Sequence, residues 1–349
     1  MIRLKLAALA TAVACAASAQ AAETYTLKFG HFLPSTSYQQ REMFEPWCDK
    51  LKEESAGRLQ CQIYPSMQLG GTPARLADMV RNGVADIVWT APSYSPGKFP
   101  RIEAVEQPFL MPYGARNSDP IIWNFYQQYA SEDFKGYKVL AMHGDGGMGF
   151  HTRSKAITSL DDLKGMKLRA SHRASALLVE SLGAAPVSMP PPQMTESLSK
   201  GVIDGVLFTW STIRDVKVDE VTRFHSEPPA GSPSLTSTVL TLLMNERKFA
   251  SLPKDLQEIL ERNSGEALNN MISNVWDKHM EGAIQATPAE QIVNISAENY
   301  AAMQKAAEPV AQNWVKEVSA KGVDGAALLQ GVREITAAQA QARLQAETR

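Results

Sequence analysis

The residues of this chain that could do chemistry form none of the compact patterns that enzymes use. A glycine-rich run, HGDGGMG, places Gly144, Gly146 and Gly149 in the G-x-G-x-x-G spacing directly after a predicted strand. A dinucleotide site would need a helix to follow, because helix amide groups hold the pyrophosphate. The residues that follow, FHTRSKAI, read as extended and polar. The run therefore indicates a turn where the chain crosses between two lobes.

Patterns for metal binding and nucleophilic catalysis are also missing from the sequence. The six histidines form neither H-E-x-x-H nor a pair spaced with carboxylates for zinc. No G-x-S-x-G elbow occurs, although Ser232 and Ser234 lie in a Gly/Pro-rich stretch that resembles a nucleophile loop. A secreted hydrolase stays an alternative, since triads can be dispersed along a chain. We expect a protein that is not an enzyme and that holds no cofactor and no metal.

The side chain best suited to bind a small molecule is Arg169, which ends the predicted strand GMKLR. A guanidinium at that position can hold a carboxylate by two parallel charge-assisted hydrogen bonds. A surface arginine or a structural ion pair is the alternative. Trp89, Phe208 and Trp210 lie at other predicted strand ends, where aromatic rings can wall an apolar ligand or simply belong to the core.

Two α/β units must position these residues. From Thr24 the sequence predicts strand, helix, strand, helix and strand, ending with ADIVWT, and this order is typical of a parallel sheet with crossover helices. The pattern restarts at KVLAMH (138–143) and runs to VIDGVLFT. The run SLTSTVLTLLMN is predicted as a strand that crosses between lobes, and helices dominate after Asp255. Ligands in such sheets lie beyond the carboxyl ends of the strands.

The first 21 residues read as a secretory signal. They combine Arg3 and Lys5 with an apolar run and an A-x-A cleavage pattern. At ~1.5 Å per residue the run is too short to span a ~30 Å hydrocarbon core. Lipidation of Cys15 is a minor alternative. Without Arg3 and Lys5, the 35 basic residues fall to 33 against 37 acidic ones, so no nucleic-acid partner is expected.

Two cysteines remain after removal of this segment. Cys48 lies in a predicted helix and Cys61 in the strand that follows it. In an oxidising compartment the pair could close a disulfide, or each could be a separately buried thiol. The spacing is not the C-x-x-C of redox or metal sites.

Three runs together resemble the DctP-type substrate-binding proteins of TRAP transporters. They are IYPSMQLGGTPARLADMVRNGVADIVWT, DDLKGMKLRAS and LGAAPVSMPPPQMTESLSKGVIDGVLFTW, in the order expected across nearly the whole mature chain. The resemblance implies an α/β, two-lobed periplasmic binding protein, with hinge crossings, a ligand cleft and a long helix shared by both lobes. We expect lobe I at 22–147 plus 235–278 and lobe II at 148–234 plus 279–349.

The same resemblance implies an extracytoplasmic, periplasmic receptor that delivers a small carboxylate to the membrane subunits of a TRAP transporter. Arg169 falls on the family's arginine that pairs with the ligand carboxylate. A binding module that feeds a sensor or chemoreceptor would share every residue named so far, so this alternative stays open.

Departures from the sialic-acid-binding branch indicate a less polar ligand. Four of its polar positions fall on the segment 32–35, Ala91, Gly149 and Phe208. A sugar acid would leave hydroxyls unpaired there, at roughly 1–3 kcal/mol each. We therefore predict a monocarboxylate, with an apolar or aromatic 2-oxo or 2-hydroxy acid favoured. Either of two histidines could supply one neutral hydrogen bond, and a serine lies on the predicted crossing strand. The candidate ligand contacts are Arg169, Trp210, Phe208, His151, His172, Phe32, Trp89 and Ser237.

Overall fold

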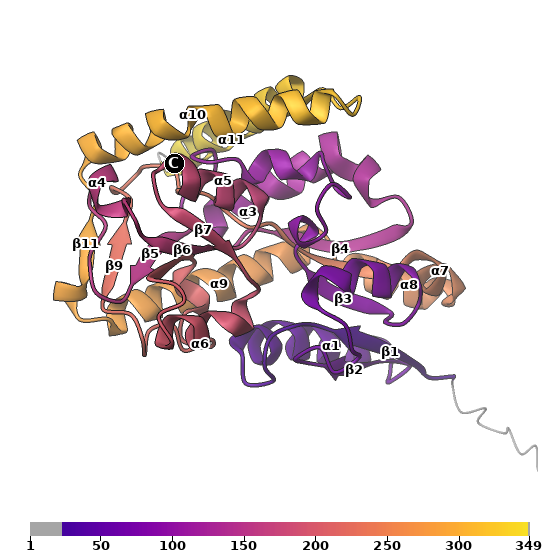
Figure 1. Ribbon diagram of the computed structural model, residues 1–349. Helices are drawn as coiled ribbons and strands as arrows, with labels where there is room; N and C mark the ends of the chain where they lie inside the picture. The colour runs from indigo at the N-terminus through magenta and orange to yellow at the C-terminus, as the bar shows by residue number, and fades with distance from the viewer. Residues whose placement is uncertain (1–22, 348–349) are drawn as a thin grey trace, which may run out of the picture.

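The computed structural model describes residues 23–347. The predicted signal segment at residues 1–21, with Cys15, lies outside the described residues. No helix within the described part of the chain is both long and apolar enough to cross a membrane. The described chain builds two sheets, each with its own helices, and a long helix near the C-terminus runs along both (Figure 1).

The first sheet has five strands in the order β2-β1-β3-β10-β4. Its strands are β1 (Tyr25–Gly30), β2 (Leu59–Tyr64), β3 (Ile87–Thr90), β4 (Tyr137–His143) and β10 (Leu240–Asn245). β1 pairs in parallel with β2 and β3, whereas β10 runs antiparallel to β3 and β4. The helices on this side are η1 (Gln39–Phe44), α1 (Glu45–Glu54), η2 (Pro73–Arg75), α2 (Leu76–Arg81), η3 (Pro92–Tyr94), η4 (Ile102–Glu106), α3 (Ala115–Phe125), η5 (Tyr126–Ala130), η6 (Ser131–Phe134), α7 (Glu246–Ser251) and α8 (Lys254–Arg262).

The second sheet has six strands in the order β11-β9-β5-β8-β6-β7. They are β5 (Gly149–Thr152), β6 (Lys167–Ala170), β7 (Ala185–Ser188), β8 (Gly205–Phe208), β9 (Phe224–Glu227) and β11 (Ile292–Asn294). β6 is parallel to β7 and β8, and β5 is antiparallel to β8 and β9. The shorter helices here are α4 (Leu160–Leu163), α5 (Arg173–Ser181), η7 (Pro191–Gln193), α6 (Met194–Ser199), η8 (Trp210–Thr212) and η9 (Ala289–Gln291).

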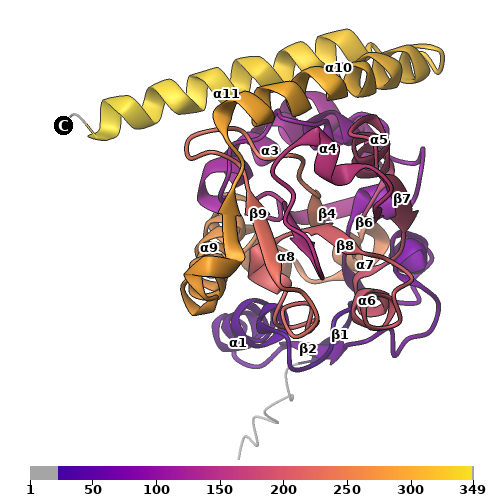
Figure 2. The ribbon, with the colours of Figure 1, turned by 60° about the vertical axis from the view of Figure 1, so that its left-hand side comes forward.

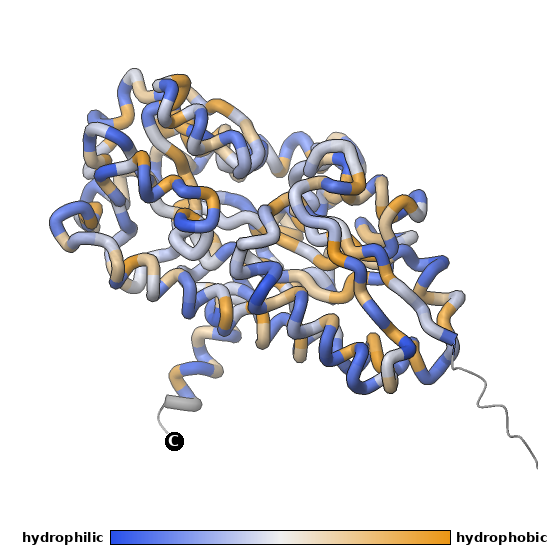
Figure 3. Tube along the Cα trace, turned by 90° about the horizontal axis from the view of Figure 1, so that it is seen from below, coloured by the Kyte–Doolittle hydropathy of each residue, from blue (hydrophilic) through white to orange (hydrophobic). Residues whose placement is uncertain are grey.

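Three long helices complete the fold: α9 (Glu266–Ala286), α10 (Ala297–Ser319) and α11 (Gly325–Glu347). α9 packs on α3 of the first lobe and on η8 of the second. α10 contributes Tyr300 and Met303 to the core of the second lobe, and Trp314 and Val318 to that of the first. Figures 2 and 3 show the end of α11 leaving the body of the molecule. Because α10 serves both cores, the lobe boundaries drawn from the sequence stay a prediction.

The turn after β4 explains the glycine-rich run. Gly146 and Gly147 adopt φ values of 75° and 96°, a region that glycine enters without strain. A Cβ at Gly147 would lie 2.7 Å from the Cβ of Ser234. No helix follows the run, because β5 begins at Gly149. The run is thus a tight crossing between the two sheets, as predicted.

The second crossing differs from its prediction. β10 begins only at Leu240, and residues 234–239 before it belong to no strand, although two backbone hydrogen bonds join Ser234 and Leu235 to the segment 109–111. Their hydroxyls are bonded instead to other crossing segments: the Thr236 hydroxyl donates to the Glu106 carbonyl oxygen at 2.8 Å, and Ser237 Oγ donates to Asp145 Oδ1 at 2.9 Å. These side-chain bonds hold the segment in place where the predicted strand is not formed.

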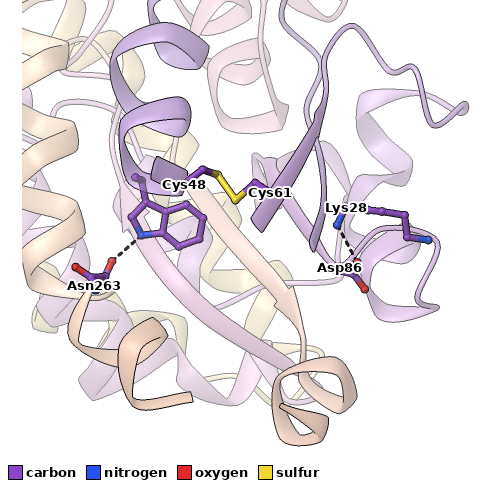
Figure 4. Close-up of a disulfide and its surroundings, with 6 residues drawn as sticks. Lys28, Cys48, Cys61, Asp86 and Asn263 are labelled. Atoms are coloured by element: carbon purple, nitrogen blue, oxygen red, sulfur yellow. Dashed lines mark hydrogen bonds between the residues drawn. A yellow bond between two sulfur atoms is a disulfide. The ribbon is translucent and has the colours of Figure 1, made fainter. Parts of the chain in front are cut away.

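A disulfide joins Cys48 in α1 to Cys61 in β2 (Figure 4). The Cα atoms are 5.7 Å apart and the sequence separation is 13 residues. Closing a loop of this length stabilises the fold by about 3 kcal/mol in the chain-entropy account. On the same helix, the Trp47 indole N–H donates to the Asn263 carbonyl oxygen at 2.7 Å, which ties α1 to the end of α8. The disulfide alternative left open by the sequence is the one that the structure adopts.

Candidate functional site

A narrow cavity lies between the two lobes, where strands of both sheets end. The hollow is partly open to solvent and comprises about 360 Å³ of space free of protein atoms. The apolar lining consists of Phe32, Leu33, Trp89, Pro191, Phe208, Leu240 and Trp276. The polar lining consists of Tyr94, Asp145, Arg169, Ser171, Thr209, Thr212 and Thr238. Four of the eight predicted contacts, Arg169, Phe208, Phe32 and Trp89, therefore meet at one cavity.

Arg169 is the buried cation of this cavity. It projects from β6, and its side chain is completely shielded from solvent. Its Nε donates to the Met189 carbonyl oxygen at 3.0 Å and its Nη1 to the Leu207 carbonyl oxygen at 3.4 Å. Nη2 is buried and has no hydrogen-bond partner. Two carbonyls thus fix the plane of the guanidinium and leave one of its donors free for a ligand.

The charge on Arg169 has no carboxylate close enough to neutralise it. None of the ion pairs within 4.0 Å in residues 23–347 includes this arginine. Burial lowers its pKa, while the nearby Tyr94 and Asp145 act in the opposite direction. A buried guanidinium without an ion-pair partner is costly, and an anion in the cavity would relieve that cost.

Aromatic rings wall the side of the cavity that belongs to the first sheet. Phe32 stacks on Trp89 with ring centroids 4.9 Å apart and meets Tyr94 at 5.7 Å. The Trp89 indole N–H donates to His143 Nε2 at 3.1 Å, and His143 Nδ1 bonds the Gly144 carbonyl oxygen at 2.8 Å. Burial lowers the pKa of His143 to about 4, so its ring is neutral at pH 7. This wall is therefore apolar and uncharged.

Phe208 supplies the facing ring from the second sheet. The Arg169 guanidinium lies over this ring, 5.3 Å from its centroid. Rings from both lobes together with a guanidinium in one lining suit an aromatic or apolar body that carries a single carboxylate.

His151 and Trp210 lie behind Phe208 and do not line the cavity. His151 Nε2 donates to the Phe208 carbonyl oxygen at 3.1 Å, and its Nδ1 lies 2.8 Å from Nδ1 of His225. Burial and the neighbouring His225 lower the pKa of His151 to about 3. The Trp210 indole N–H donates to the buried carboxyl of Glu227. Both side chains are satisfied by protein groups, so contact of either with a ligand stays a prediction.

His172 and Ser237 each stand next to a lining residue rather than in the lining. The His172 ring lines a different hollow, and its Nδ1 accepts from the Ser175 backbone N–H at 3.4 Å as the cap of α5. Ser237 donates to Asp145. Their chain neighbours Ser171 and Thr238 face the cavity. Direct ligand contact by His172 or Ser237 likewise stays a prediction.

Several lining residues escaped the sequence analysis. Asp145 lies inside the glycine-rich run, which was interpreted only as a turn. Tyr94 follows the end of β3 by four residues, and that position after a strand could have drawn attention to it. Trp276 lies within α9, where nothing in the sequence separates a ligand contact from a core residue.

Comparison with known proteins gives the same picture. Residues 29–317 match the family described as bacterial extracellular solute-binding protein, family 7. A TRAP solute binding protein from Rhodoferax ferrireducens T118, in complex with copurified benzoate, is 38% identical, with a TM-score of 0.87 over 92% of this chain and 100% of that one. A marine metagenome TRAP solute binding protein specific for aromatic acid ligands, with 3-hydroxybenzoate, is 35% identical, with a TM-score of 0.86 over 91% and 99%.

A third structure is more distant in sequence. The TRAP periplasmic solute binding protein from Bordetella bronchiseptica, with bound (R)- and (S)-mandelate, is 27% identical, with a TM-score of 0.80 over 89% of this chain and 98% of that one. These matches confirm the two-lobed α/β fold, the periplasmic location and the expectation of a binding protein that is not an enzyme. The chain belongs to the family 7 bacterial extracellular solute-binding proteins and is a solute receptor of the TRAP type.

Proposed function

We propose that this receptor captures a small monocarboxylate with an aromatic or otherwise apolar body and pairs its carboxylate with Arg169. The observation that carries the proposal is the buried Nη2 of Arg169, without a hydrogen-bond partner, in a cavity that is also lined by aromatic rings. Phe32 and Trp89 would cover one face of the ligand, and Phe208 the other.

The ligands of the similar structures support this class of acid. Benzoate, 3-hydroxybenzoate and mandelate each carry one carboxylate on an aromatic body. Mandelate is in addition a 2-hydroxy acid, the kind that the sequence favoured. A polyhydroxylated sugar acid would meet the neutral ring wall of Phe32 and Trp89, where its hydroxyls find few partners.

The four remaining candidates act through the residues that touch the ligand. His151 and Trp210 pack behind Phe208 and hold the end of β8 in position. Ser237 holds Asp145, and His172 caps α5 beside the cavity. None of the four then needs to contact the acid directly.

Capture of the ligand depends on the fact that each lobe contributes part of the site. Phe32 and Trp89 come from the first lobe, whereas Arg169 and Phe208 come from the second. A carboxylate that docks on Arg169 gains the ring contacts of the other lobe only when the lobes close, so the ligand favours the closed state. Without an anion, closure would bury an unpaired guanidinium.

The closed, occupied receptor would then deliver its acid to the membrane subunits of a TRAP transporter. A role in feeding a sensor or chemoreceptor uses the same site, and a measurement of uptake separates the two. Transport predicts that deleting the gene abolishes uptake of the acid, whereas a sensory role predicts that uptake persists and the response to the acid is lost.

The ligand class is tested with protein that has been unfolded, dialysed and refolded to remove copurified ligand. We expect benzoate, hydroxybenzoates, mandelate or phenylpyruvate to raise the melting midpoint by several degrees, because ligand at 100 times its Kd adds about 2.7 kcal/mol of stability. Succinate and galacturonate serve as dicarboxylate and sugar-acid controls. A shift produced by galacturonate alone, or by no acid at all, would contradict the proposal.

A further inference from the structure

A second ionisable side chain lines the cavity and has no part in the capture proposed above. Asp145 lies in the turn after β4, and only 3% of the residue is exposed. It faces the same cavity as Arg169, yet the two form none of the ion pairs within 4.0 Å in residues 23–347. The cavity therefore holds a cation and an anion that do not form an ion pair with each other.

The position of Asp145 is fixed from several directions. Its Oδ1 accepts from the Gly147 backbone N–H at 3.1 Å and from Ser237 Oγ at 2.9 Å. Its backbone carbonyl oxygen accepts from Thr209 Oγ1 at 2.6 Å and from the Trp276 indole N–H at 2.7 Å. These partners belong to the turn itself, to the second crossing segment, to the end of β8 and to α9. A group held this firmly can discriminate between ligands that differ by one polar atom.

Burial of this carboxyl group is unfavourable in the absence of a further partner. Removal from water raises its pKa to about 6, although hydrogen bonding from Gly147, Ser237 and Thr238 acts in the opposite direction. An ionised carboxylate has about four acceptor positions, and the bonds from Gly147 and Ser237 both go to Oδ1. At pH 7.5 the group remains mainly ionised and can accept another hydrogen bond from the cavity.

We propose that Asp145 accepts a hydrogen bond from a hydroxyl group of the bound acid, so that the receptor selects hydroxylated aromatic monocarboxylates and rejects dicarboxylates. The inference rests on the proposed function, because it needs the carboxylate of the acid to be held by Arg169. A hydroxyl that donates to a carboxylate makes a charge-assisted bond. A second carboxylate in its place would meet the like charge of the buried Asp145 carboxylate.

The negative charge of Asp145 determines how much a hydroxyl on the ligand should strengthen binding. A hydrogen bond to an ionised group corresponds to about tenfold to hundredfold in Kd. Sites built to bind a hydroxyl discriminate strongly against the analogue without it, because their own polar group is then left unpaired. The same acid with and without its hydroxyl is therefore the sharpest probe.

Calorimetry at pH 7.5 on ligand-stripped protein tests the inference with benzoate, the three hydroxybenzoates, mandelate, phenylacetate and isophthalate. We expect at least one hydroxy acid to bind ten or more times as tightly as its parent acid, and isophthalate to bind more weakly than benzoate. Asp145→Ala should bring the hydroxy acid to within about threefold of its parent. Asp145→Asn, which keeps the shape but not the charge, should raise the affinity for isophthalate relative to benzoate.

Asp119→Asn is the matched control. Asp119 is equally buried and accepts from the Gly144 N–H of the same turn at 2.8 Å, but it does not line the cavity. This variant should keep the wild-type ratios. Equal affinities of parent and hydroxy acids in wild type, or ratios unchanged in Asp145→Ala, would overturn the inference and leave the capture of aromatic acids standing. Wild-type protein that binds none of these acids would overturn the proposed function as well.

Discussion

Replacing Arg169 by methionine should separate ligand binding from folding. The substitution removes the donor that the ligand carboxylate needs, and losing one partner of a buried charged pair costs about 2–5 kcal/mol. At 1.4 kcal/mol for each factor of ten, the Kd of benzoate or mandelate should rise by a factor that lies between roughly 30 and several thousand. Isothermal titration calorimetry on ligand-stripped protein measures this directly.

The stability of the ligand-free variant follows from two opposing effects. Removing a buried guanidinium relieves its desolvation cost, and replacing a whole buried ion pair by apolar side chains is neutral or stabilises a protein by about 1–4 kcal/mol. Against this, the Met189 and Leu207 carbonyl oxygens each lose the donor that Arg169 supplies, at about 1–3 kcal/mol each when left unpaired. The two effects nearly cancel, so the melting midpoint without ligand should move by only a few degrees in Arg169→Met.

A surface arginine provides the control for this variant. Arg173 is four residues further along the chain, and it pairs with Glu317 across two partly exposed side chains. Pairs of this kind contribute about 0–1 kcal/mol, so Arg173→Met should bind benzoate within about twofold of wild type. If Arg169→Met bound the acid within threefold of wild type while folding normally, the assignment of Arg169 as the carboxylate anchor would be refuted.

Three further predictions concern the frame around the site. The double variant Cys48→Ser, Cys61→Ser should lose about 3 kcal/mol of unfolding free energy in urea denaturation and keep its ligand affinity; equal stability would exclude a stabilising disulfide. Burial raises the pKa of Glu227 to about 7, so the native state keeps on this group a proton that the unfolded chain releases above about pH 4.5, and the stability that this one group contributes is lost as pH rises from 4.5 to 7. Glu227→Gln should remove this loss, worth roughly 3 kcal/mol, and parallel pH profiles of the two proteins would contradict it. Gly147→Ala should destabilise the fold by more than about 1 kcal/mol, because its φ is 96° and the new Cβ would lie 2.7 Å from Ser234 Cβ; an unchanged urea midpoint would argue against this strain.

The sequence located strand ends well but not which side chains on the shared face reach the cavity. Arg169, Trp89 and Phe208 were identified because they end predicted strands, and all three line the cavity. His151 was placed beside them, and the register does put it on the same face of the second sheet as Arg169, because both pair with Val206. Its ring nitrogens, however, bond His225 and the Phe208 carbonyl oxygen, and it does not line the cavity. Alternation along a strand assigns a side chain to a face, but it does not tell which positions on that face a cavity reaches.

Residues on turns and shared helices were harder to predict for a different reason. Asp145 lies in a turn, where no periodicity signals which side chains point inward. α10 reads as one amphipathic helix, but Tyr300 belongs to the core of the second lobe and Trp314 to the core of the first. Which core each turn of such a helix joins depends on contacts between segments far apart in the chain, which local sequence does not encode.

A crystal structure of the ligand-stripped protein soaked with benzoate tests the central claim most directly. The account predicts the carboxylate within hydrogen-bonding distance of Arg169 Nη2, with the ring between Phe32 and Phe208. Benzoate bound outside this cavity, or inside it with the carboxylate turned away from Arg169, would contradict the account.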